Sequence, residues 1–131
     1  MVSTLQKLFT VDYDPALECG SLIWNNHVFS TEFRVVLEYF IEFIADRPLK
    51  RALWDTRKLV VISQTDQEWF VEIILPVLIA KGYRYGAIIV RNDNSDDLVN
   101  EVIVDSVSQY GVETRYFNNQ EEAKEWLHKT L

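Results

Sequence analysis

Cysteine, histidine and glycine are all scarce in this chain of 131 residues. A single cysteine, Cys19, excludes a disulfide within the chain and fits a reducing compartment, so we expect a cytoplasmic protein. The two histidines, His27 and His128, stand far apart, and neither has a second ligand at zinc-type spacing, so no metal site is expected. The four glycines do not form a phosphate-binding loop, and no cofactor is expected.

Long hydrophobic runs and an excess of positive charge are also missing. The longest apolar stretch, Ile73 to Ala80, is too short to span a bilayer and contains Pro76. The first residues, MVSTLQKLFTVDYD, lack a basic segment followed by an apolar run, so no signal peptide is expected. The net charge of −7 opposes binding to a phosphate backbone or an anionic bilayer. We therefore expect neither a nucleic-acid partner nor membrane insertion.

The chain does contain enough apolar material for one core. Hydrophobic residues make up 48% of it and charged residues 25%, which is typical of a soluble globular protein. No linker, repeat or low-complexity segment interrupts residues 1–131, so we expect a single domain.

Segments with a strand period alternate with segments with a helix period along the chain. Phe9, Val11 and Tyr13 alternate with polar residues, as in a half-exposed strand. The predicted strands cover Phe9 to Asp14, Cys19 to Trp24, the segment that ends at Asp55, Tyr85 to Val90 and Val112 to Phe117. The predicted helices cover Thr31 to Asp46 with Ser30 as N-cap, Asp66 to Lys81, a segment with an apolar face from Val99 to Tyr110, and a final helix capped by Asn119.

These elements follow one another as β-β-α-β-α-β-α-β-α. The short link between the first two strands favours an antiparallel pair, whereas helices join the later strands through right-handed crossovers. The sequence therefore predicts an α/β fold with a mainly parallel sheet of four to five strands. We expect the first strand to lie antiparallel at the edge and the helices to cover both faces.

The stretch from Lys50 to Trp69 joins the expected central strand to the second helix. The strand ends at Asp55, and the helix opens near Ser63 to Thr65. Thr65 has a glutamate three residues later, which is the spacing of a capping box. Pro76 lies inside this helix and cannot donate a backbone hydrogen bond, so we expect a kink or a break there.

Three segments resemble the SpoIIAA-like family, which is related to STAS domains and is often described as STAS/SEC14-like. They are ALWDTRKL at the end of the central strand, SQTDQEWF at the start of the second helix with Pro76 downstream, and YFNNQEEAKEWL near the end of the chain. The resemblance covers nearly the whole chain. It implies a sheet flanked by helices and built from successive βα turns.

The better-known relatives of that family are anti-sigma factor antagonists, which are switched by phosphorylation of a serine in an Asp-Ser-Ser/Thr-Gly motif. In the resemblance, the residues from Ser63 to Asp66 take the place of this motif, and Thr65 keeps a hydroxyl near the phosphorylated position. Asp66 replaces the glycine, and together with Glu68 it would repel a phosphate. Because Thr65 keeps the hydroxyl, a phospho-switch at this residue is one alternative function, although these two acidic side chains oppose it.

We expect a non-enzymatic STAS-like binding or regulatory module, because no segment carries an assembled catalytic set. Its partner is expected to be a small apolar or lipid-like ligand or another protein. A second alternative is a small enzyme that uses Asp55, although hydrogen bonds from loop amides would give Asp55 a structural role. A ligand site is expected at the carboxyl ends of the parallel strands, formed by Trp24, Asn25, Asp55, Thr56, Ser63, Thr65, Trp69 and Arg91.

A second apolar row on the first predicted helix indicates self-association. Val35, Tyr39 and Phe43 recur every fourth residue beside the stripe that faces the sheet. The second helix is apolar on nearly all sides, and its outer face is predicted to carry Val71, Leu75 and Leu78. A homodimer would bury these side chains. The competing interpretation is that the two helices cover one another, or that nearby Lys and Arg stems cover them.

Overall fold

The computed structural model describes residues 7–59, 62–91 and 106–131. Within these residues, five strands form one sheet in the order β1-β2-β3-β4-β5. They are β1 (Phe9–Asp14), β2 (Cys19–Trp24), β3 (Arg51–Asp55), β4 (Tyr85–Ile89) and β5 (Glu113–Phe117). Strand β1 pairs antiparallel with β2, and every later pair is parallel. The predicted sheet, with its antiparallel first strand at the edge, is confirmed.

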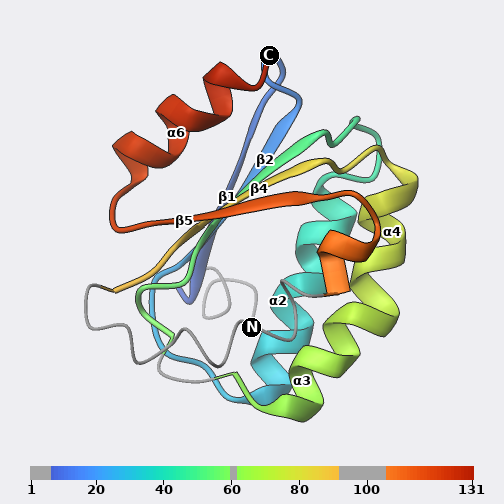
Figure 1. Cartoon of the computed structure of the whole chain (residues 1–131). Helices are drawn as coiled ribbons and strands as arrows, with labels where there is room; N and C mark the ends of the chain where they lie inside the picture. Colours follow the sequence, from blue (N-terminus) through green and yellow to red (C-terminus); the bar gives the residue numbers. More distant parts are fainter. Residues whose placement is uncertain (1–6, 60–61, 92–105) are drawn as a thin grey trace.

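The helices divide unevenly between the two faces of the sheet. Figure 1 shows α2 and the continuous run α3–η1–α4 on one face and α6 on the other. Their bounds are α2 (Ser30–Phe43), α3 (Gln64–Trp69), η1 (Phe70–Ile74), α4 (Leu75–Ala80) and α6 (Gln120–Lys129). Strands β2 to β5 lie side by side in chain order, so right-handed crossovers place their connecting helices on the same face. Residues 106–109 are helical, whereas the loop and most of the third helix predicted over residues 92–105 lie outside the described residues.

Alternation along β3 separates two apolar cores. Ala52 and Trp54 belong to the larger core under α2 and α3–η1–α4, while Leu53 belongs to the smaller core under α6. All five residues of β3 are buried, as expected of a central strand covered on both faces. Because successive side chains point to opposite faces, Asp55 at the end of β3 lies on the same face as Leu53.

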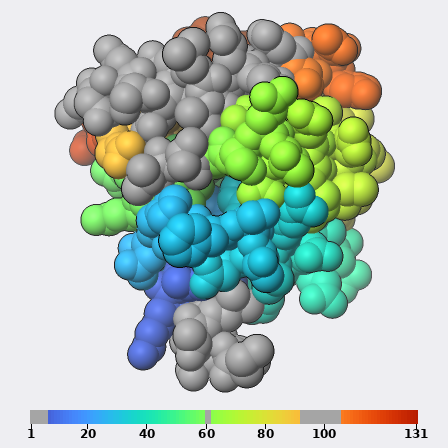
Figure 2. All heavy atoms as spheres, turned by 90° about the horizontal axis from the view of Figure 1, so that it is seen from below, coloured from blue at the N-terminus to red at the C-terminus, as the bar shows by residue number. Residues whose placement is uncertain are grey.

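Helix α2 begins one residue earlier than predicted. Phe29 is its N-cap, and the side chain of Glu32 accepts a hydrogen bond from the Phe29 backbone N–H at 3.0 Å. The predicted cap, Ser30, is already helical, and its hydroxyl donates to Asp66 at 2.8 Å. This bond ties the starts of α2 and α3 together, and Figure 2 shows the first turns of both helices on one face of the molecule.

The second predicted helix contains a π turn in place of a sharp kink. Pro76 cannot donate to the carbonyl of Glu72, and the wider turn of η1 accommodates the missing hydrogen bond just before it. Ser63, rather than Thr65, is the N-cap, because its hydroxyl oxygen accepts from the Asp66 N–H at 3.1 Å. The predicted capping box at Thr65 is therefore wrong.

The exposed side of this helix differs from the predicted one. Leu75 and Leu78 are 1% and 0% exposed, so the prediction that they lie on the outer face is wrong. Ile73 and Val77 are exposed instead. Phe70, Ile74 and Leu78 recur every fourth residue and are all buried, so this side of the helix faces the core.

Candidate functional site

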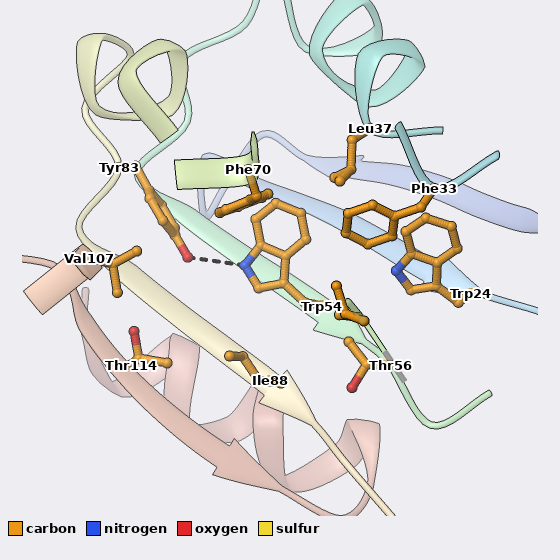
Figure 3. Close-up of a pocket in the computed structure, with 11 residues that line it drawn as sticks. Trp24, Phe33, Leu37, Trp54, Thr56, Phe70, Tyr83, Ile88, Val107 and Thr114 are labelled. Atoms are coloured by element: carbon orange, nitrogen blue, oxygen red, sulfur yellow. Dashed lines mark hydrogen bonds between the residues drawn. The ribbon is translucent and has the colours of Figure 1, made fainter. Parts of the chain in front are cut away.

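A small cavity lies between the sheet and the larger helical layer. Its volume is about 60 Å³, and it crosses four neighbouring strands from β2 to β5 (Figure 3). The described side chains that line it are Trp24, Phe33, Leu37, Trp54, Thr56, Ile62, Phe70, Tyr83, Ile88, Val107 and Thr114. None of these side chains carries a charge at neutral pH. The cavity therefore offers an apolar, largely aromatic surface with a few polar atoms.

Aromatic pairs hold the walls of the cavity in place. Trp24 and Phe33 are stacked, with ring centroids 5.5 Å apart and planes 10° apart. Trp54 meets Phe70 edge to face at 6.0 Å and also contacts Phe40 of α2 at 5.3 Å. Offset and edge-to-face arrangements of this kind are favourable and restrict ring rotation. The rings are therefore positioned by the folded core before any ligand enters.

Polar groups gather at one end of the cavity. The indole N–H of Trp54 donates to the hydroxyl oxygen of Tyr83 at 3.0 Å. Burial of Tyr83 raises the pKa of its hydroxyl, so this group stays protonated. Thr114 lies at the same end, and its hydroxyl oxygen is buried without a hydrogen-bond partner among the described residues. Toward Trp24 and Phe33, at the other end, the polar group in the wall is the Thr56 hydroxyl, which donates to the Ile89 carbonyl oxygen at 2.9 Å (Figure 3).

A second hollow adjoins the end of the cavity near Phe33. It has a volume of about 180 Å³ and shares two lining residues, Phe33 and Ile62, with the cavity. The hollow also receives polar side chains from the starts of α2 and α3, namely His27, Ser30, Ser63 and Asp66. The two spaces are therefore separated by the side chains of Phe33 and Ile62.

Asp66 is held ionised at the edge of this hollow. Burial of its carboxyl group works against ionisation, but hydrogen bonds from Ser30 at 2.8 Å and Arg34 at 2.9 Å keep the pKa below its ordinary value. The guanidinium of Arg34 also lies over the ring of Trp69, 5.2 Å from its centroid. Asp66 thus joins α2 to α3 through two side-chain bonds.

Asp55 belongs to a separate cluster on the opposite face of the sheet. Its carboxylate accepts from Arg57 at 3.0 and 2.7 Å and from Gln120 of α6 at 3.0 Å. Burial works against ionisation of Asp55, but these hydrogen bonds hold its pKa below the ordinary value. Both carboxylate oxygens are engaged, and neither partner is an acid. The arrangement anchors α6 to the end of β3.

The structure divides the eight predicted ligand-site residues among different places. Trp24 and Thr56 line the cavity, and Ser63 lines the second hollow. Trp69 lies behind Phe33, with ring centroids 6.5 Å apart, rather than in the cavity wall. Asn25 and Thr65 are exposed, Arg91 is half-buried after β4, and Asp55 lies on the α6 face. The side chains at the strand ends thus diverge to both faces of the sheet.

Several cavity residues are ones that sequence patterns assign only to the core. Phe33, Leu37 and Ile88 follow ordinary core spacing, so their pattern carries no signal of a cavity. Gly86, in the strand beneath the cavity, does carry a signal, because a glycine inside a buried strand often marks a place where another group approaches the backbone closely. A Cβ atom at Gly86 would collide with the hydroxyl of Tyr83 and lie 3.8 Å from the Thr114 hydroxyl. Gly86 therefore marks the polar end of the cavity.

The described residues provide no metal site and no activated thiol. They contain no group of three His, Cys, Asp or Glu side chains able to hold a metal ion. Burial raises the pKa of the Cys19 thiol to about 11, so the thiol stays protonated. None of the helices in this part of the chain is long and apolar enough to cross a bilayer.

Comparison with known proteins identifies the architecture. Neither a family model nor a curated protein matches the sequence. Among solved structures, 91% of this chain superposes on 93% of an uncharacterised protein from the DUF3478 family of Shewanella loihica PV-4, described as having a SpoIIAA-like fold. The TM-score is 0.57 and the sequence identity is 14%, so the likeness concerns the fold alone. The narrower likeness to STAS and SEC14 domains stays a prediction. The chain has a SpoIIAA-like α/β fold.

Proposed function

We propose that this protein is a non-enzymatic binding module that takes a small, uncharged, apolar molecule into the cavity under α2 and α3–η1–α4. The observation that carries the proposal is the cavity itself, about 60 Å³ of open space bounded by aromatic rings and aliphatic side chains. Ligand pockets are typically lined by apolar and aromatic groups with a few placed polar atoms, and this cavity has that composition.

The size of the cavity limits the shape of the ligand. An engineered apolar cavity of roughly 150 Å³ accepts benzene, so 60 Å³ is narrow for a ring. An unbranched chain is thinner, and it can continue toward the second hollow if the side chains of Phe33 and Ile62 shift. An elongated aliphatic molecule therefore fits this space better than a bulky one.

The surroundings of Asp55 support a binding role over an enzymatic one. Its carboxylate lies on the α6 face, across the sheet from the cavity, and is engaged by Arg57 and Gln120. A general base needs a lone pair that can reach the substrate, and here hydrogen bonds occupy both oxygens. Thr65 is exposed, so it is accessible to modification, but neither the cavity nor the second hollow includes it.

The proposal is tested by native mass spectrometry and by titration with an aliphatic probe. Protein purified without denaturant is expected to carry a bound apolar molecule or to bind added 2-methyl-1-heptene saturably, seen as shifts in tryptophan fluorescence. Val107→Phe, which fills the cavity, should abolish binding, whereas Val77→Phe adds the same ring on the exposed side of α4 and should not. A clean apo spectrum with no saturable binding to the folded wild type would refute the proposal.

We further propose that the protein forms a homodimer, although the row assigned to the contact is smaller than expected. Val35 and Tyr39 are 41% and 36% exposed. Tyr39 packs against Phe9 at 5.2 Å, and the guanidinium of Arg47 covers the ring of Phe43 at 4.5 Å. The remaining contact therefore rests on Val35 and Tyr39, and one end of the row is covered by an arginine.

A further inference from the structure

We infer that the cavity selects a neutral carbonyl compound, held through its oxygen by the hydroxyls of Tyr83 and Thr114. This inference rests on the proposed binding function and names the ligand class. Two hydroxyl groups at the polar end of the cavity have protons to donate. Because a buried donor without an acceptor costs free energy, a ligand that brings an acceptor oxygen is favoured.

The first hydroxyl belongs to Tyr83. Its oxygen already accepts the N–H of Trp54 at 3.0 Å, which fixes its position in the wall. No residue in the described part of the chain accepts the proton of the Tyr83 hydroxyl. Tyr83 is 4% exposed, so bulk water does not provide a ready acceptor. The group is therefore a fixed donor with an unused proton.

The second hydroxyl belongs to Thr114. Its oxygen is buried and lacks a hydrogen-bond partner among the described residues. Both hydroxyls lie close to Gly86: a Cβ atom built there would collide with the Tyr83 hydroxyl and would lie 3.8 Å from the Thr114 oxygen. Figure 3 shows the two groups at the same end of the cavity, beside Val107. One acceptor atom bound between the two hydroxyls would meet both donors.

The charge of the site decides which acceptor fits. No described lining residue is ionised, so an anionic carboxylate would lose its hydration without gaining a counter-ion. A ketone or aldehyde oxygen accepts two hydrogen bonds and has a much smaller desolvation penalty. The apolar rings between Trp54 and Trp24 then cover the aliphatic remainder of the molecule.

A matched pair of probes tests the inference. 2-Heptanone and 2-methyl-1-heptene have nearly the same shape, but only the ketone has an acceptor oxygen. Wild type is expected to bind the ketone about 3- to 10-fold more tightly, the value of one to two net hydrogen bonds. Tyr83→Phe and Thr114→Val should each reduce this preference, measured as the ratio of the two affinities within the same variant. Tyr85→Phe, on the α6 face beside Trp126, is the matched control and should keep the preference.

The outcomes separate this inference from the function on which it rests. Equal affinity for both probes in wild type would overturn the carbonyl inference and leave the binding function standing. A clean apo spectrum together with binding of neither probe would overturn both. Thr114→Val supplies an independent check, because losing an unpaired buried hydroxyl should not lower the melting temperature of the unliganded protein. A ketone preference that persists in folded Thr114→Val and Tyr83→Phe proteins would also refute the inference.

Discussion

The indole nitrogen of Trp54 donates a 3.0 Å hydrogen bond to the hydroxyl oxygen of Tyr83 in the wall of the cavity. The bond connects β3 to Tyr83, which lies just before β4, and both side chains are buried in the larger core. It satisfies the buried N–H of Trp54 and sets the position of the Tyr83 hydroxyl. The same contact therefore serves core stability and the polar end of the candidate site.

Tyr83→Phe is expected to lower the free energy of unfolding by about 1–3 kcal/mol, because it leaves the Trp54 N–H buried without an acceptor. Urea denaturation followed by tryptophan fluorescence measures this change. Tyr85→Phe is the control: Tyr85 is half-buried, and its loss of a hydroxyl should cost less than about 0.5 kcal/mol. Equal losses in the two variants would contradict the assigned role of the bond.

Asp55→Asn is expected to destabilise the protein by about 1–3 kcal/mol near neutral pH. The substitution replaces one accepting carboxylate oxygen by an NH₂ group, which cannot accept the hydrogen bonds that Arg57 and Gln120 donate. Glu113→Gln is the control, since its pair with Arg115 is solvent-exposed and should contribute about 0.5 kcal/mol or less. Chemical denaturation of both variants and wild type gives the comparison. Ligand binding should not change in Asp55→Asn, because the cluster lies across the sheet from the cavity.

The contribution of Asp55 should also depend on pH. Its pKa is lowered in the folded state, so the stabilisation is present above the unfolded pKa of about 3.9 and is lost as pH falls through the folded value. The difference in unfolding free energy between wild type and Asp55→Asn should therefore be constant near neutrality and shrink below about pH 4. A difference that grows on acidification would show that this sign is wrong.

Gly20→Ala should destabilise the protein by about 1–3 kcal/mol through overpacking. A Cβ atom at Gly20 would lie 2.9 Å from Leu49 Cδ1 and from Phe40 Cζ, both of which are fully buried. Ser21→Ala, at the next position of β2, points to the opposite face and should change stability by less than about 0.5 kcal/mol. Thermal unfolding compares the melting temperatures of the two variants with that of wild type. An unchanged melting temperature for Gly20→Ala would show that Leu49 and Phe40 can shift without cost.

The homodimer prediction is tested by sedimentation velocity. The double variant Val35→Glu/Tyr39→Glu places two charges on the exposed row of α2 and should sediment as a monomer where wild type sediments as a dimer. Tyr116→Glu, on β5, is the control and should not affect association. Wild type that is monomeric at high micromolar concentration would refute the dimer.

Local sequence patterns were enough to predict the strands, the order of the elements and the approximate positions of the described helices. Alternation in Phe9 to Asp14 and the continuous apolar run before Asp55 depend only on which faces of a strand are covered. Short links and helical crossovers then leave few ways to arrange the sheet, which explains why β1 was predicted at the edge. The structural role of Asp55 could also be predicted, because a carboxylate at the end of a buried strand needs hydrogen-bond donors.

Tertiary structure alone decided where space remains and which helix residues face out. A hydrogen bond lost at Pro76 can be absorbed as a kink, a break or a wider turn, and packing on the sheet selects among them. Here a π turn forms at Phe70–Ile74, and Leu75 and Leu78 face the core. The cavity depends on rings from strands and helices far apart in the sequence. Periodicity shows that such side chains are buried, but whether they fill the space between them depends on their mutual packing, which no local pattern contains.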